Sequence, residues 1–329
     1  MKGSHRSPTA VQPLPFISNE YRFAWVVVLI ALLIDCCWLS ISGCSVRVEG
    51  IVKILKAAGL IACIIAGLHT VSRIPRYEAL SEKLRYRDVA NTAKWMLVLL
   101  CFVPSIAVLS YLCGTIKAPL IDDSLLRFDN AIGFDWLATY RWVHAHTLVK
   151  QVFDLAYRSI SWQFVAIPAI LGLGRRQQDL SDFVMNLMLS SVLVLLISTA
   201  FPATSAFLRY AITDPNTVST ISDFNLLRSG TLRVFNLDEM QGLVTMPSFH
   251  TTLAILFAYA LRRVPVLFPV AIVLNVLLIV STPTQGGHYV ADLFGGALLS
   301  VVTIVLARKW SSAIQSRAFA PDPGRSLVR

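Results

Sequence analysis

The chain has 329 residues, of which 55% are hydrophobic and only 15% are charged, and its formal net charge is +10. Soluble domains contain about 25% charged residues, so this composition excludes an ordinary soluble domain and favours a membrane protein. The positive charge is concentrated between apolar stretches. It indicates membrane topology and contact with anionic lipids rather than nucleic-acid binding, because no RNA- or DNA-binding motif accompanies it.

Eight apolar segments run along the chain after a polar, proline-containing stretch over residues 1–20 that we expect to be disordered. A helix needs about 20 mostly apolar residues to cross the hydrocarbon core. The sixth segment reaches that length only if its helix begins at Pro247. The sequence therefore predicts an all-α polytopic membrane bundle of about eight transmembrane helices, over residues 23–41, 51–68, 93–112, 152–173, 183–201, 251–261, 264–282 and 290–307.

Basic residues gather on one side of this predicted bundle. If the N-terminus is cytoplasmic and the chain crosses eight times, the cytoplasmic segments hold 18 of the 29 lysines and arginines. Lysine and arginine in short loops favour the cytoplasmic side. We therefore expect both termini in the cytoplasm, two accessory transmembrane helices and a cytoplasmic loop in residues 21–92, and a cytoplasmic tail in residues 309–329.

Two of the segments expected on the opposite side are long. Residues 114–150 mix acids with aromatic residues at near-helical spacing, among them Asp122, Asp129 and Trp136, and tryptophan and tyrosine favour the membrane interface. Residues 202–249 form the longest outside loop, and long structured loops are usually functional. We expect the first segment to lie in the interface and the second to form a lid or a wall around a substrate head group.

One candidate site group stands at the start of the last apolar segment. His288 and Asp292 are four residues apart, so on a helix they lie one turn apart on the same face. The carboxylate can accept a hydrogen bond from one imidazole nitrogen, which orients the ring and makes the other nitrogen more basic. Gly287 has no side chain, so a substrate oxygen can approach the backbone closely there. The alternative is that Asp292 pairs with His288 only to join two helices.

A second group, Pro247-Ser248-Phe249-His250, precedes another apolar segment. Proline suits the first turn of a helix, where unpaired N–H groups and the positive end of the helix dipole collect. A phosphate docked there would receive backbone donors, the Ser248 hydroxyl and the His250 imidazole. The alternative is that Ser248 is a simple helix cap and His250 an interfacial polar residue.

The two groups together, with Ser281, resemble the second and third motifs of the type 2 phosphatidic acid phosphatase (PAP2) superfamily. Within it the chain is similar to the branch that includes inositol phosphorylceramide synthases and bacterial relatives, because Phe201-Pro202-Ala203 matches a Phe-Pro segment of that branch. The resemblance covers about residues 120–308. It implies a six-helix PAP2-like catalytic core over residues 93–308, a bacterial inner-membrane location and an active site at the periplasmic face.

The resemblance also implies a mechanism that uses no cofactor and no metal. His288 is then the nucleophile that forms a phosphohistidine, Asp292 orients it, and His250 protonates the leaving oxygen and afterwards activates the acceptor. The phosphate is held by Ser248 and by backbone amides such as that of Gly287. The expected substrate is a membrane lipid phosphate, the acceptor is water or an alcohol, and the oligomeric state is unknown.

The chain departs from the superfamily pattern where phosphate-binding cations are expected. Thr282 stands where the third motif has an arginine, and the first motif, a lysine followed after six residues by Arg-Pro, is absent. A transferring phosphoryl group needs positive charge around it, so we expect Arg228 and Arg233 to supply it. The alternative is that both arginines contact lipid phosphates nonspecifically. Loss of the usual cations also fits a phosphodiester, which carries less charge than a monoester.

We therefore predict an integral membrane lipid phosphatase or phosphotransferase. Hydrolysis and head-group transfer of the inositol phosphorylceramide synthase kind share the first half-reaction and differ in whether water or an alcohol resolves the phosphohistidine. A lipid transporter is a candidate of another class, although transporters tend to carry internal repeats and broken helices at mid-membrane. A non-catalytic membrane scaffold is a third, against which the two histidines and the aspartate argue.

Overall fold

The computed structural model describes the backbone of residues 18–212 and 218–318, and the side chains of residues 18–212 and 223–310. The expected disordered stretch, residues 1–20, falls almost wholly outside this range, and its last residues, Asn19 and Glu20, belong to the first helix. Within the described residues the chain is helical apart from two short strands, which confirms the all-α part of the predicted fold class.

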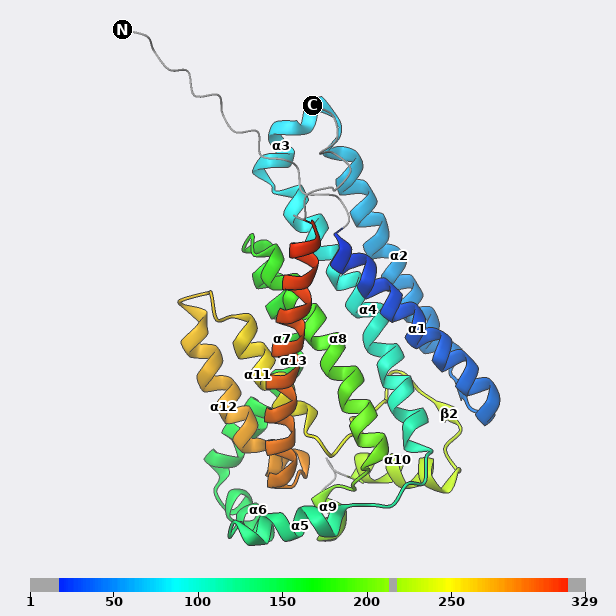
Figure 1. Cartoon of the computed structure of the whole chain (residues 1–329), viewed down its shortest axis with the longest axis vertical. Helices are drawn as coiled ribbons and strands as arrows, with labels where there is room; N and C mark the ends of the chain where they lie inside the picture. The colour runs from blue at the N-terminus through cyan, green and yellow to red at the C-terminus, as the bar shows by residue number, and fades with distance from the viewer. Residues whose placement is uncertain (1–17, 213–217, 319–329) are drawn as a thin grey trace, which may run out of the picture.

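The N-terminal part consists of two long antiparallel helices followed by a third (Figure 1). The first begins where the Ser18 hydroxyl accepts a hydrogen bond from the Tyr21 N–H and ends at Gly43, which adopts a left-handed conformation with φ 64°. The elements are α1 (Asn19–Ser42), β1 (Ser45–Val46), α2 (Val48–Val71), η1 (Pro75–Tyr77), α3 (Glu78–Lys83) and α4 (Tyr86–Gly114).

The remaining elements form the rest of the bundle and a layer across its lower end (Figure 1). Strand β2 pairs in parallel with β1, which ties the long loop to the α1–α2 turn. The elements are α5 (Asp122–Ala131), α6 (Trp136–Ala145), α7 (Thr147–Leu173), α8 (Gln177–Ala200), α9 (Ala206–Arg209), α10 (Val218–Ser229), β2 (Val234–Phe235), α11 (Phe249–Ala260), α12 (Leu267–Gly286) and α13 (Val290–Ala318).

The expected segment boundaries agree only in part with these elements. The division between residues 92 and 93 falls inside α4, and residues 309–318 of the expected tail continue α13. The rest of that tail, residues 319–329, lies outside the described residues.

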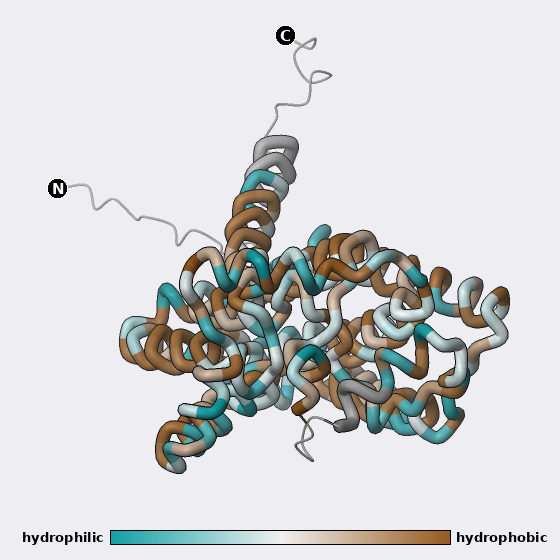
Figure 2. The backbone as a smooth tube through the Cα atoms, turned by 90° about the horizontal axis from the view of Figure 1, so that it is seen from below, coloured by the Kyte–Doolittle hydropathy of each residue, from teal (hydrophilic) through white to brown (hydrophobic). Residues whose placement is uncertain are grey.

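Six described helices are long and apolar enough to cross a membrane: α1, α2, α4, α8, α12 and α13. Figure 2 shows hydrophobic residues, in brown, over much of the helical part of the molecule. Of the other two expected segments, α7 carries Lys150, Asp154 and Arg158 in its first half, and α11 has only 12 residues, or about 18 Å. Helix α11 does not begin at Pro247, because Ser248 has an extended backbone and caps the helix with its hydroxyl.

The bundle packs around a hydrophobic core of buried side chains from six helices, among them Val28, Phe102, Leu171, Leu187, Phe257 and Ala271. Helices α11 and α13 approach one another closely. A Cβ atom at Gly296 would lie 2.3 Å from the Ser248 carbonyl oxygen, and the Thr252 hydroxyl donates to the Gly296 carbonyl at 3.0 Å. The two helices that begin with the histidine motifs are therefore held together directly.

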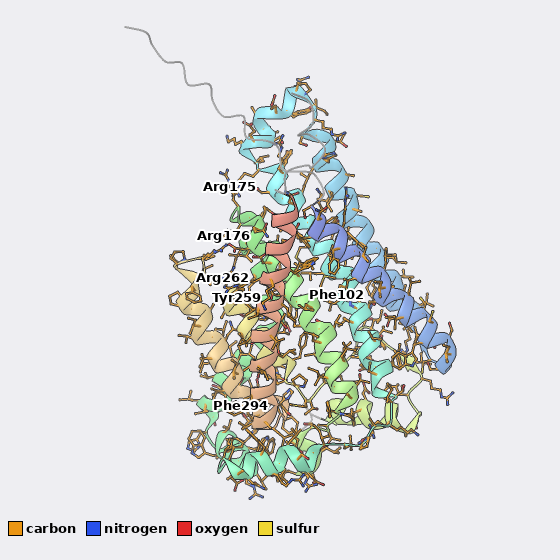
Figure 3. All side chains as sticks on the ribbon, viewed as in Figure 1. Phe102, Arg175, Arg176, Tyr259, Arg262 and Phe294 are labelled. Carbon is orange, nitrogen blue, oxygen red and sulfur yellow. The ribbon has the colours of Figure 1, made fainter. Side chains whose placement is uncertain are left out.

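The basic loops lie at the end of the bundle away from the histidine motifs. Figure 3 shows Arg175, Arg176 and Arg262 toward the end opposite Phe294, which packs against Phe128 of α5. Near these arginines, the Arg263 guanidinium pairs with Asp179 at 3.0 Å. The charge pattern in the sequence predicts this separation of the basic loops from the histidines.

Candidate active site

A three-residue break between α12 and α13 carries His288. Helix α12 ends at Gly286, and Gly287 turns the chain with φ +65°, a left-handed conformation that side chains disfavour. A Cβ atom at Gly287 would lie 2.1 Å from Ser205 Oγ and 2.3 Å from the Phe207 ring. Only glycine fits at position 287, and the absence of a side chain there lets the break pack against α9.

Backbone groups of the break find partners on the lower layer of the molecule. The Trp136 indole N–H donates to the His288 carbonyl at 3.0 Å, and the Ala206 N–H donates to the Gly287 carbonyl at 2.7 Å. The Asp129 carboxylate accepts the N–H groups of Val290 and Ala291, both at 3.0 Å. Burial raises the pKa of Asp129, and these two hydrogen bonds partly offset that rise. The segment predicted to lie in the interface thus positions His288, a role that the sequence did not indicate.

The buried Asp292 carboxylate lies behind the His288 ring. Its Oδ2 is 3.3 Å from His288 Nδ1 and also accepts the Tyr289 N–H at 2.9 Å. The Asp292 side chain is fully buried and His288 is 4% exposed. Burial lowers the pKa of His288 to about 4, and a hydrogen bond with the Thr245 backbone acts in the opposite direction. The His288 imidazole is therefore neutral at pH 7.

The second histidine faces the first from the start of α11. Ser248 is fully buried: its hydroxyl accepts the Thr251 N–H, and its own N–H donates to the Asp292 carbonyl at 3.0 Å. The His250 ring stacks on Tyr157 at a centroid distance of 4.6 Å and lies 5.8 Å from the His288 ring. The two motifs, 38 residues apart in the chain, thus meet at one place.

Both histidines line a cavity of about 220 Å³. Among the residues that line it there is no lysine, arginine, aspartate or glutamate. The lining includes Gln285, whose buried Nε2 has no hydrogen-bond partner in the described part of the protein. Gln285 was not among the predicted site residues, although it is a polar residue in the last turn of α12, three positions before His288. Further polar groups come from Tyr157, Thr204, Ser205 and Thr245.

The other predicted phosphate-binding residues lie around this cavity or away from it. Ser248 and Gly287 pack behind the histidines without lining the cavity. Arg228 donates to the carbonyls of Ile116 and Ala118 and lines a smaller adjoining cavity of about 30 Å³. Arg233 donates to the Gly230 carbonyl next to β2 and lies close to Gly43, outside both cavities.

Metal ligands do not gather at this site. Across the part of the chain that the structure describes, no three histidine, cysteine, aspartate or glutamate side chains are grouped as a metal ion requires.

Comparison with known proteins gives one match. A family model described as the PAP2 superfamily matches residues 123–306, which is more than half of the chain and includes both histidines and Asp292. The match shows the superfamily, and the predicted inositol phosphorylceramide synthase branch stays a prediction. Searches of curated proteins and of solved structures gave no match. Helices α1 to α4 lie outside the matched range.

Substitution of Asp129 tests the support of the break. We expect Asp129→Asn to lower the free energy of unfolding by about 1–3 kcal/mol, because the amide cannot accept both backbone N–H groups. The measurement is the thermal midpoint in detergent. Asp123→Asn is the matched control, since Asp123 is also on α5 but exposed and paired only with Arg209, and such surface pairs contribute about 0–1 kcal/mol. Equal shifts of the thermal midpoint in the two variants would contradict the role of Asp129 in supporting the break between α12 and α13.

The buried neutral state of His288 predicts a pH-dependent stability. Its pKa is about 4 in the folded protein and 6.5 in the unfolded chain, so the unfolded state binds more protons between these values. Stability that His288 contributes at pH 7 is therefore lost as the pH falls from about 6.5 to about 4. We expect the difference in thermal midpoint between wild type and His288→Gln to shrink as the pH falls through this range. A pH-independent difference would rule out the buried neutral imidazole.

Proposed function

The chain belongs to the PAP2 superfamily, and from this membership we propose that it is an integral membrane enzyme that cleaves a lipid-linked phosphoester through a phosphohistidine. The observation that carries the proposal is the meeting of two imidazoles, 5.8 Å apart, in one cavity with a buried carboxylate behind one of them. A nucleophile oriented by a carboxylate, with an acid–base group opposite, is the arrangement that covalent phosphoryl transfer needs.

In the first step a nitrogen of His288 bonds to phosphorus while the bond to the leaving oxygen breaks. Asp292 holds the ring and stabilises the positive charge that develops on it. His250 donates a proton to the leaving oxygen and then accepts one from the attacking water or alcohol. This second step releases His288 and returns both histidines to their starting state.

The phosphate site proposed here depends on neutral donors. Gln285 Nε2 is an unpaired donor at the cavity, and none of the described residues that line the cavity carries a formal positive charge. Thr282, at the position of the superfamily arginine, is fully buried and its hydroxyl donates to the Leu278 carbonyl. Arg228 is the nearest of the two arginines that we predicted, in the adjoining cavity. A site with so little charge favours a phosphodiester or another weakly charged lipid phosphate over a dianionic monoester.

Two reaction outcomes follow from the same intermediate. Attack by water makes the protein a lipid phosphatase, which we take as the leading class. Attack by a lipid alcohol makes it a head-group transferase of the inositol phosphorylceramide synthase kind, and the absence of cations at the cavity favours this second outcome.

We further propose that α7 and α11 cross the membrane with the six long apolar helices, which gives eight spans in total. The histidines then lie at the periplasmic face of a bacterial inner membrane, and the basic loops and both termini in the cytoplasm. The separation of Arg175, Arg176 and Arg262 from the lower layer supports this orientation (Figure 3).

Alanine substitution of the histidines tests the reaction. We expect His288→Ala to abolish release of phosphate or head group in detergent, with phosphatidic acid, diacylglycerol pyrophosphate, isoprenyl pyrophosphate, and phosphatidylinositol plus ceramide as substrates and mass spectrometry of the products. We expect His250→Ala to lower the rate by about 10²–10⁴-fold and to accumulate phosphorylated His288. His146→Ala is the control, because His146 lies outside the cavity. Turnover that survives in His288→Ala would refute the mechanism. No turnover in wild type would favour a transporter or scaffold.

Gln285 provides a separate test of the neutral phosphate site. We expect Gln285→Leu to lower kcat/KM by about 10–100-fold, the effect of removing one donor to a charged group. We expect Gln285→Arg to raise kcat/KM for a phosphomonoester relative to a phosphodiester, because the new cation stabilises the second negative charge. The measurement is the ratio of the two kcat/KM values. An unchanged ratio in the arginine variant would place the phosphate elsewhere.

A further inference from the structure

We propose that α1, α4 and α8 form a binding groove for a hydrocarbon chain of the lipid substrate, connected to the two histidines by a narrow passage. This inference rests on the proposed function and adds to it the place where the apolar part of the substrate binds. Helices α1 and α4 lie outside the range that the family model matches. About half of the residues that line the groove, nine of 17, thus come from outside the matched range.

The groove is a cavity of about 650 Å³ with an almost wholly apolar lining and no charged residue. Its volume falls within the range of about 300–1,000 Å³ that is typical of ligand pockets. On α1 the lining extends from Phe23 to Trp38, and on α8 from Met185 to Ala200. Fifteen helical steps correspond to about 22 Å, whereas one leaflet of the hydrocarbon core is about 15 Å deep. The groove can therefore hold a full lipid chain along the helices.

Shared lining residues connect this groove to the catalytic cavity. Cys113 and Thr199 line both the groove and the 30 Å³ cavity that Arg228 also lines. That small cavity in turn shares Phe224, Leu243 and Thr245 with the histidine cavity. The three cavities therefore stand in series, apolar at one end and polar at the other.

The dimensions of the series match the parts of an amphiphile. The narrow middle cavity admits the short linker between a chain and its phosphate, and the 220 Å³ histidine cavity takes the phosphate. The apolar groove takes the methylene groups, since burying apolar surface there is favourable at about 25 cal/mol per Å². This continuity with the catalytic cavity argues for a substrate chain in the groove, and not for a helix of another protein.

A buried hydrogen bond fixes the wall of the groove. The Ser105 hydroxyl of α4 donates to the Asp35 carboxylate of α1 at 2.6 Å, and Asp35 is only 4% exposed. An ionisable side chain in an apolar helix is costly unless it is paired. The pair therefore holds α1 against α4 at the height of Ile34 and Trp38, which line the groove.

Chain-length selectivity tests the groove. Val192 is half-buried on α8 and lines the groove near its middle, so Val192→Trp should obstruct the groove there. Val273→Trp on α12 is the matched control, because Val273 is 61% exposed and lies outside the groove. With phosphatidic acid carrying two C8 or two C16 chains as probes, we expect Val192→Trp to lower the C16-to-C8 ratio of kcat/KM about tenfold and the control to leave it unchanged. An unchanged ratio in Val192→Trp, with turnover of the C8 lipid retained, overturns the groove and leaves the proposed function intact.

Photocrosslinking gives a second measurement that needs no turnover. A phosphatidic acid with a diazirine in its acyl chain is bound to His288→Ala protein, and labelled peptides are identified by mass spectrometry. We expect labels on α1 near Ile30 and on α8 near Val192, and a strong reduction of both in the Val192→Trp background. Labels spread evenly over the exposed faces of α12 and α13, or absence of labels from α1 and α8, overturn the proposal. Crosslinks from α1 or α8 to a second copy of the protein, in place of the lipid, would also overturn the proposal.

Discussion

The residues between α12 and α13 are not helical and are buried. Their backbone N–H and C=O groups must therefore find hydrogen-bond partners outside a helix. An unpaired buried amide or carbonyl costs about 1–3 kcal/mol, and this break contains several such groups within five residues. The protein meets that constraint with partners from elements far away in the chain: Asp129, Trp136, Ser205 and Ala206. The layer formed by α5, α6 and α9 is therefore the support of His288, and the position of the ring depends on it.

The same constraint joins the two histidine motifs. The Ser248 N–H at the start of α11 has no partner within its own helix and donates to the Asp292 carbonyl on α13. Glycine at position 296 allows the two helices to come close enough for this bond. His250 and His288 thus face one cavity because two helix starts satisfy each other's backbone. The relative placement of the two rings follows from these helix termini rather than from a hydrogen bond between the rings.

Features that depend on neighbouring residues, such as helices and the His288–Asp292 pair, could be predicted from local sequence patterns. Contacts between residues far apart in the chain could not. A spacing of four residues predicts the pairing of His288 with Asp292, and the apolar segments predict the six long helices. The partners of Asp129 and Trp136 lie about 150–160 residues away, so the sequence marked these residues as interfacial without indicating their role. Arg233 is close to His250 in the chain, but the Arg233 carbonyl accepts a hydrogen bond from the Ser45 N–H. The pairing of β2 with β1 thus holds Arg233 away from the cavity.

Helix α11 is about 18 Å long, whereas the hydrocarbon core is about 30 Å thick. No residue of α11 is exposed, because α7, α8, α12 and α13 pack around this helix. Protein rather than hydrocarbon therefore surrounds it, and hydrophobic mismatch, which costs a fraction of a kcal/mol per Å, does not act on it directly. His250 thus lies in a part of the molecule that the neighbouring helices, and not lipid, enclose.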